Sequence, residues 1–144
     1  MSNTLFQKIA EVSAAIGPLA ADKRNQQQKY DYISADKILE RAGREMADRG
    51  LVVIPAIVDE VIDSVPWKQG FRYDVRVDFE MTVADADGNN AAFMWFGRGS
   101  DYSVPDKAMY KAITSGHKYF LMKLFNVGVG NEDGEHETPP QNQA

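Results

Sequence analysis

Residues 71–83 alternate strictly between apolar and polar side chains, and this pattern constrains the fold more than any other feature of the sequence. Every second residue is apolar, in the order Phe71, Tyr73, Val75, Val77, Phe79, Met81 and Val83. The residues between them are charged or hydroxylic, in the order Arg72, Asp74, Arg76, Asp78, Glu80 and Thr82. Because successive side chains of a β-strand point to opposite faces, this period of two predicts a strand with one buried face and one wet face.

Flanking segments supply the partners that such a strand needs. Residues 51–58 are apolar and β-branched, and Pro55 within them favours an edge position or a bulge. The Asp-Gly pair at 87–88 is typical of a hairpin turn, so residues 91–96 are the expected returning strand. Its last four residues are all apolar, which predicts a central or covered strand. Residues 97–101 contain two glycines and are expected to break the sheet.

Helices are expected on both sides of these strands. Residues 4–16 carry apolar side chains at helical spacing, and residues 22–28 are too polar to build a core and are expected to form a loop. Ser34 is a typical N-cap for a second helix, and Gly50 is the glycine expected just beyond its end. A proline at 105 fits the first position of a long helix over 105–125.

The sequence therefore predicts one α+β domain over residues 1–128, with two N-terminal helices, a three-stranded antiparallel β-sheet and a long C-terminal helix. The net charge of the 144 residues is −5, but residues 131–144 hold four acidic and no basic residues. Removing these leaves −5 − (−4) = −1 for residues 1–130, which hold all 16 basic residues. Residues 129–144 are expected to form a disordered acidic tail, and the near-neutral body is compatible with a local basic surface.

Composition also excludes several classes of protein. The chain has no cysteine, which excludes disulfides and thiolate metal sites and is compatible with a reducing cytoplasm. No apolar run approaches the ~20 residues of a membrane span, and the N-terminus lacks the layout of a signal peptide. We therefore expect a cytoplasmic protein that does not associate with membranes.

The long C-terminal helix carries the first candidate site. At 100° per residue, Lys107, Lys111, Thr114 and Lys118 fall within about 60° of one another on one face. No Asp or Glu lies between residues 107 and 125, so these lysines have no acidic partner along the helix. Two interpretations follow from spacing alone. The stripe is either the solvated face of an amphipathic helix or a row of cations for a phosphate backbone.

Two tyrosines near the N-terminus form a second candidate. Tyr30 and Tyr32 alternate beside Lys29 at the end of the polar segment. Aromatic faces can stack on unpaired bases, while a lysine contacts phosphate. The alternative is that both tyrosines only anchor the segment to the core.

Catalytic and metal sites find little support in the sequence. Asp74, Asp78 and Glu80 share a strand face, but interleaved arginines favour ion pairing over a nuclease metal site. The glycines of residues 97–101 lack the Gly-Lys-Ser/Thr ending of a phosphate-binding loop, and His117 has no partner at nucleophile spacing. We expect neither an enzyme nor a bound cofactor.

Two further groups have structural as well as functional interpretations. Asp101 and Asp106 are better explained as capping or subunit-bridging carboxylates than as metal ligands. Trp67 and Trp95 are expected in the core or at a subunit contact, with DNA contact as an alternative for Trp67 in its expected loop.

The specific motif lies between residues 97 and 125. It consists of Gly97-Arg98-Gly99-Ser100-Asp101, Asp106-Lys107-Ala108, Lys111-Ala112, Thr114, Lys118-Tyr119, Leu121 and Phe125. With Lys29, Tyr30, Tyr32, Ser34 and Gly50-Leu51 upstream, it resembles the signature of the Erf family of phage single-strand annealing proteins. The resemblance spans roughly residues 5–127. The same helix is also similar to one in eukaryotic strand-annealing repair proteins, in which the residue matching Lys118 lies in a DNA-binding groove.

The resemblance implies a β-β-β-α core that forms a homo-oligomer, as a ring or a helical filament, and pairs complementary strands without ATP. The implied DNA-binding residues are Lys29, Tyr30, Tyr32, Arg98, Lys107, Lys111, Thr114 and Lys118. Tyr119 and Met122 depart from the eukaryotic pattern, which is basic at both positions, so those contacts are not carried over.

The rival functions are a single-strand-binding protein that does not anneal, a metal-dependent nuclease and a partner-binding protein without a DNA role. The resemblance leaves open whether the chain also contacts a phage exonuclease or host replication factors.

Overall fold

The computed structural model describes residues 4–127, so the acidic tail expected over 129–144 lies outside the described residues. The elements are α1 (Thr4–Ile16), β1 (Lys23–Asn25), β2 (Tyr30–Tyr32), α2 (Ala35–Asp48), β3 (Leu51–Trp67), β4 (Gly70–Asp85), β5 (Asn90–Asp101) and α3 (Pro105–Leu124). The α+β architecture predicted from the sequence is confirmed. None of the described helices is both long enough and apolar enough to cross a bilayer.

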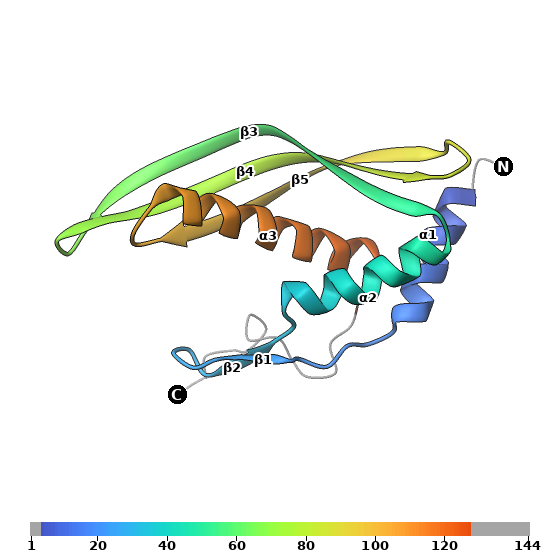
Figure 1. The fold of residues 1–144 in the computed structure, drawn as a ribbon, viewed down its shortest axis with the longest axis horizontal. Coiled ribbons are helices and arrows are strands. Elements are labelled where there is room, and N and C mark those ends of the chain that lie inside the picture. The colour runs from blue at the N-terminus through green and yellow to red at the C-terminus, as the bar shows by residue number, and fades with distance from the viewer. Residues whose placement is uncertain (1–3, 128–144) are drawn as a thin grey trace.

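A three-stranded antiparallel sheet in the order β3-β4-β5 forms the main layer, with α3 lying along one of its faces (Figure 1). Helices α1 and α2 gather at one end of this layer, and a small β1–β2 hairpin lies beyond α2 (Figure 1). The alternation of β4 is confirmed over residues 75–83, where Val75, Val77, Phe79, Met81 and Val83 are buried in the core. Phe71, which was expected on the same buried face, is 49% exposed.

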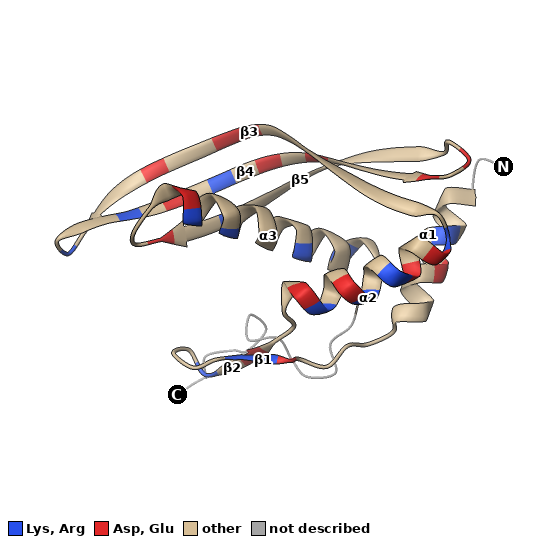
Figure 2. Cartoon of the chain, in the orientation of Figure 1, with Lys and Arg blue, Asp and Glu red and all other residues tan. Residues whose placement is uncertain are grey.

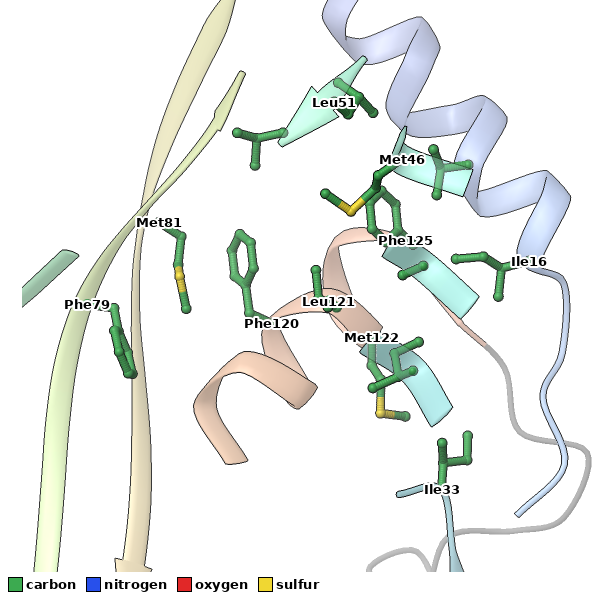
Figure 3. Packing of buried hydrophobic residues seen from close by; sticks show 14 of the residues in the cluster. Ile16, Ile33, Met46, Leu51, Phe79, Met81, Phe120, Leu121, Met122 and Phe125 are labelled. Atoms are coloured by element: carbon green, nitrogen blue, oxygen red, sulfur yellow. The ribbon is translucent and has the colours of Figure 1, made fainter. Parts of the chain in front are cut away.

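The core forms where β4 and α3 meet the N-terminal helices. Phe79 and Met81 from the sheet face Phe120 and Leu121 from α3, as Figure 3 shows. Side chains from the two N-terminal helices, such as Ile16 and Met46, close the cluster at the end of the sheet. Each fully buried side chain of this size contributes about 1.5–3 kcal/mol to the free energy of folding, so this contact fixes α3 on the sheet.

The predicted boundaries of the second helix are confirmed. The Lys37 amide donates a hydrogen bond of 3.1 Å to the Ser34 hydroxyl, which caps the first turn of α2. Gly50 follows the helix with a φ of +67°, a conformation that glycine adopts without steric cost. This glycine lets the chain turn directly from α2 into β3.

Strand β5 corrects two expectations. It is an edge strand and not central, and α3 covers only one of its faces, since Met94 and Phe96 on the other face are 65% and 44% exposed. The glycine-containing segment 97–101 does not break the sheet, because it continues the ladder with β4 to the pair of Tyr73 with Asp101. The central strand is β4, which pairs with both β3 and β5.

The glycines of β5 allow α3 to approach the strand closely. A Cβ atom added to Gly97 would lie 2.0 Å from the Ala112 carbonyl oxygen, and one added to Gly99 would lie 2.5 Å from the Ala108 carbonyl oxygen. On the helix, a Cβ atom added to Gly116 would lie 3.2 Å from the Gly97 Cα. Small residues of both the helix and the strand thus permit this approach.

The polar segment 22–28 was expected to be a loop, and this expectation is wrong for its central residues. Lys23–Asn25 pair with Tyr30–Tyr32 in an antiparallel hairpin. The Asn25 side chain accepts hydrogen bonds of 3.0 Å from the amides of Gln27 and Gln28, which stabilises the turn. This hairpin is held by local polar contacts and carries no apolar pattern, so periodicity alone does not reveal it.

Strand β3 extends to Trp67, well beyond the expected end at Val58, because β4 pairs with it along its whole length. Trp67 therefore ends a strand instead of lying in a loop. The expected edge position is confirmed, and the register shifts between Ile57 and Asp59. The acidic residues beyond this shift interrupt the apolar run in the sequence. For this reason the apolar pattern did not predict the second half of the strand.

Candidate nucleic-acid interface

A cleft of about 670 Å³ opens between the β1–β2 hairpin, the edge of β5 and α3. Its lining includes six of the eight residues proposed from the sequence, namely Tyr30, Tyr32, Arg98, Lys111, Thr114 and Lys118. Basic residues lie along the side of α3 that faces away from the sheet, and further ones lie on the hairpin (Figure 2). Among the described residues, no carboxylate lines this cleft.

Lys118 lies in the wall of the cleft and is only 8% exposed. Its Nζ is 5.2 Å from the ring centre of Tyr32 and 4.7 Å from that of Tyr119. An ammonium above aromatic faces gains about 0.5–2 kcal/mol, more when it is shielded from water. The β1–β2 hairpin and α3 thus hold a cation between two aromatic rings.

Lys111 corrects the expectation that the helix lysines lack acidic partners. Its Nζ donates hydrogen bonds to Asp101 Oδ1 at 2.9 Å and to the Ser100 carbonyl oxygen at 3.0 Å. The partner comes from the end of β5 instead of from the helix, so spacing along α3 cannot identify it. The Lys111 side chain is still 57% exposed, which leaves its ammonium accessible from the cleft.

Lys107 and Lys29 are not brought into the cleft. Lys107 is exposed one turn before Lys111, beyond the end of the lining. Lys29 is exposed in the hairpin turn with a φ of +62°, and its amide donates a 2.7 Å hydrogen bond to the Asn25 carbonyl oxygen. Both side chains are cationic, but neither lines the cleft.

Six of the twelve lining residues were not proposed from the sequence, among them two tyrosines and Asn25. Tyr110 is 69% exposed on α3, and Tyr119 follows Lys118 in the lining. Its position directly before Lys111 on the same helix was a sequence signal that could have identified Tyr110. Asn25 also lines the cleft, but a lone asparagine in a polar segment gives no such signal.

Asp101 joins the end of β5 to the start of α3. It accepts hydrogen bonds from the Ser103 hydroxyl at 2.6 Å, the Ser103 amide at 2.9 Å and the Val104 amide at 3.2 Å, in addition to the Lys111 ammonium. The Ser103 hydroxyl, followed by the Lys111 ammonium, lowers the pKa of this carboxyl well below its usual range. These bonds stabilise the turn before α3, and the N-cap residue of the helix, Val104, makes no side-chain capping hydrogen bond, so the capping role expected for Asp101 is wrong.

We expect Asp101→Asn to lower thermal stability at neutral pH while tightening binding to single-stranded DNA. A depressed carboxyl pKa stabilises the fold above the ordinary pKa of about 4, and this contribution is lost as pH falls through the folded-state value. The stability difference from the parent should therefore shrink in acid. Removing a negative charge beside Lys111 should raise affinity about 2- to 5-fold at low salt.

Thermal unfolding at pH 7 and in acid, with DNA titrations at low salt, measures both effects. Asp87→Asn is the matched control, because Asp87 pairs with Lys8 at the β4–β5 turn. Equal effects of the two substitutions would contradict a specific role for Asp101.

Two carboxylates on the opposite face of the sheet are engaged in ion pairs. Arg72 pairs with Asp74 and Arg76 pairs with Asp78, each at 2.9 Å. Within residues 4–127, no group of three acidic or histidine side chains is placed to hold a metal ion. His117 is half-buried, and this burial lowers its pKa.

The second tryptophan of the sequence packs against α3. The Trp95 indole N–H donates a 3.0 Å hydrogen bond to the Gly116 carbonyl oxygen, and its ring lies 5.8 Å from that of Phe120. The core position expected for Trp95 is therefore only half-buried, at the border between β5 and α3.

Comparison with known protein families identifies a family whose sequence pattern this chain matches. The model of the ERF superfamily matches residues 5–144, which includes nearly the whole chain. No curated protein matches it. The match agrees with the motif of residues 97–125 and with the β-β-β-α arrangement of β3, β4, β5 and α3. The chain therefore belongs to the ERF superfamily of phage single-strand annealing proteins.

Proposed function

We propose that this protein binds single-stranded DNA in the cleft beside α3 and pairs complementary strands without nucleotide hydrolysis. The observation that carries the proposal is a cleft whose described lining contains Arg98, Lys111 and Lys118 together with four tyrosines and no carboxylate. Basic grooves with aromatic side chains are typical of proteins that bind single strands with little sequence preference. Membership of the ERF superfamily supports an annealing role.

In this proposal, phosphates lie against the three cations while bases stack on the tyrosine rings that line the cleft. Tyr30 and Tyr32 lie 6.0 Å apart, measured between ring centres, with a tilt of 59°, so they offer two differently directed faces. Each stacked base contributes about 1–3 kcal/mol to binding. Thr114 supplies a hydroxyl that can donate to a phosphate oxygen between Lys111 and Lys118.

Annealing requires many short sites in a row, and we propose that a homo-oligomer, as a ring or a helical filament, provides them. Each subunit then adds its weak contacts through effective concentration. Base pairing supplies the driving free energy, so no nucleotide site is required. The protein would act in the cytoplasm of a bacterial host, where a phage exonuclease or host replication factors are its candidate partners.

Mixing two complementary oligonucleotides with and without the protein tests the proposal directly. We expect faster pairing in the absence of ATP, measured by energy transfer between end labels. Because three cations line the cleft, affinity should fall with salt at a logarithmic slope of about −2 per subunit.

Other outcomes favour the rival functions. Binding without faster pairing would indicate a protective single-strand-binding protein. Cleavage after addition of magnesium would indicate a nuclease, and the absence of salt-sensitive binding would exclude a DNA role for this cleft.

A further inference from the structure

A second aromatic surface lies at the tip of the β3–β4 hairpin, away from the cleft. Trp67 ends β3 and Tyr102 follows β5, and their ring centres are 5.5 Å apart with a tilt of 45°. Trp67 is 41% exposed and Tyr102 is 60% exposed. Neither residue belongs to the hydrophobic core, so the pair exposes aromatic faces to solvent.

Cations adjoin this pair. The Arg72 guanidinium lies 5.6 Å from the centre of the Trp67 ring and is held there by its ion pair with Asp74. Lys68 lies in the hairpin turn with a φ of +55°. A hollow of about 500 Å³ runs between Trp67, Lys68, Phe71 and Tyr102, and its described lining holds no carboxylate.

A third hollow, lined by residues of the sheet face opposite α3, borders both this tip and the cleft. It has a volume of about 610 Å³ and shares Arg98 and Gly99 with the cleft and Tyr102 with the tip. Arg98 pairs with Arg76 across the ladder, six residues along β4 from Gly70, which pairs with Trp67. At about 3.3 Å per residue, the two ends are roughly 20 Å apart, which is within reach of one extended oligonucleotide.

The charges along this route suit a polyanion. Arg72, Arg76 and Arg98 line this third hollow together with two carboxylates, Asp63 and Asp74. Asp74 is already engaged, since it accepts hydrogen bonds from Arg72 and, at 2.7 Å, from the Ser100 hydroxyl. The route therefore has aromatic rings at both ends, and the hollow between them is lined by three arginines and two carboxylates. Exposed ring faces suit unpaired bases, whereas a duplex keeps its base faces stacked inside.

We propose that Trp67 and Tyr102 form a stacking platform for an unpaired base of a single-stranded nucleic acid that leaves the cleft past Arg98. The platform rests on the proposed function, because it extends the same strand. Lys68 and Arg72 contact the phosphates beside the stacked base. The strand is then held at two aromatic sites, with arginines between them.

Tryptophan fluorescence reports on the platform directly. The chain has two tryptophans, and Trp95 is half-buried with its indole N–H bonded to the Gly116 carbonyl. Adding oligothymidylate should quench the emission of the parent protein, and Trp67→Phe should lose most of this quenching while binding normally. Quenching that persists in Trp67→Phe would overturn the platform.

Oligonucleotide length separates the platform from the cleft. We expect the double variant Trp67→Ala/Tyr102→Ala to bind oligothymidylates of about 16 nucleotides about 5- to 100-fold more weakly, while affinity for about 4 nucleotides is unchanged. Phe6→Ala is the control, because Phe6 is an equally exposed aromatic residue, 57% exposed on α1. It should leave affinity unchanged at every length.

The failures are distinguishable. If the parent binds single strands but the double variant binds every length equally well, the platform is overturned and the proposed function stands. A changed oligomer size in the double variant would also overturn it, since the aromatic pair would then be a contact between copies. If the parent binds no single-stranded DNA, the proposed function fails and the platform falls with it.

Discussion

Gly97→Ala is expected to destabilise the fold by about 3 kcal/mol or more, the upper range for overpacking a core. The added methyl group would lie 2.0 Å from the Ala112 carbonyl oxygen and 2.9 Å from the Gly116 Cα. Both are backbone atoms of α3, so relief requires the whole helix to move from the sheet. Thermal unfolding should show the midpoint about 10 °C lower.

Gly43→Ala is the matched control. This glycine is exposed on α2, and a Cβ atom added there meets nothing within 4 Å. Alanine in an exposed helix interior should stabilise by about 0.5–1 kcal/mol relative to glycine. A Gly97→Ala protein as stable as its parent would mean that α3 does not pack on β5 at this spacing.

Lys118→Met is expected to weaken single-strand binding about 10- to 100-fold, the range for losing a hydrogen bond that involves a charge. Methionine keeps the aliphatic length that fills the wall between Tyr32 and Tyr119 and removes only the ammonium. The annealing rate should fall in parallel, while oligomer size and helical content remain those of the parent.

Lys123→Met controls for the loss of one charge from the same helix. Lys123 is exposed in the last turn of α3 and does not line the cleft. Its replacement should change affinity little. If Lys118→Met anneals normally, the strand does not pass through this cleft, whatever the stability of the variant.

The elements predicted correctly are those whose signals are local. The alternation along β4 and the Ser34 cap depend on neighbouring residues of the same element, so the sequence contains the full pattern. Gly97 and Gly99 show the opposite case. A glycine pair normally weakens a strand, and only the closeness of α3, which folding creates, explains its position inside β5.

The candidate site divides in the same way. Helical spacing placed Lys107, Lys111 and Lys118 on one face, but it could not show where along that face the cleft ends. The Asp101 partner of Lys111 lies on a different element, so its ion pair was not predictable. Tyr32 was chosen as an aromatic neighbour of a lysine, yet the cation that it contacts is Lys118, which is distant in sequence.

The free edge of β3 also limits how copies of this protein could join. Its exposed Asp59, Glu60 and Asp63 follow one another closely beyond the register shift. A two-fold dimer that aligned this half of the edge with its own copy would bring six carboxylates together, and like charges directly opposite destabilise strand pairing. The acidic half of this strand therefore disfavours a two-fold dimer formed by pairing of β3 edges. It favours association with a different surface of the neighbouring copy.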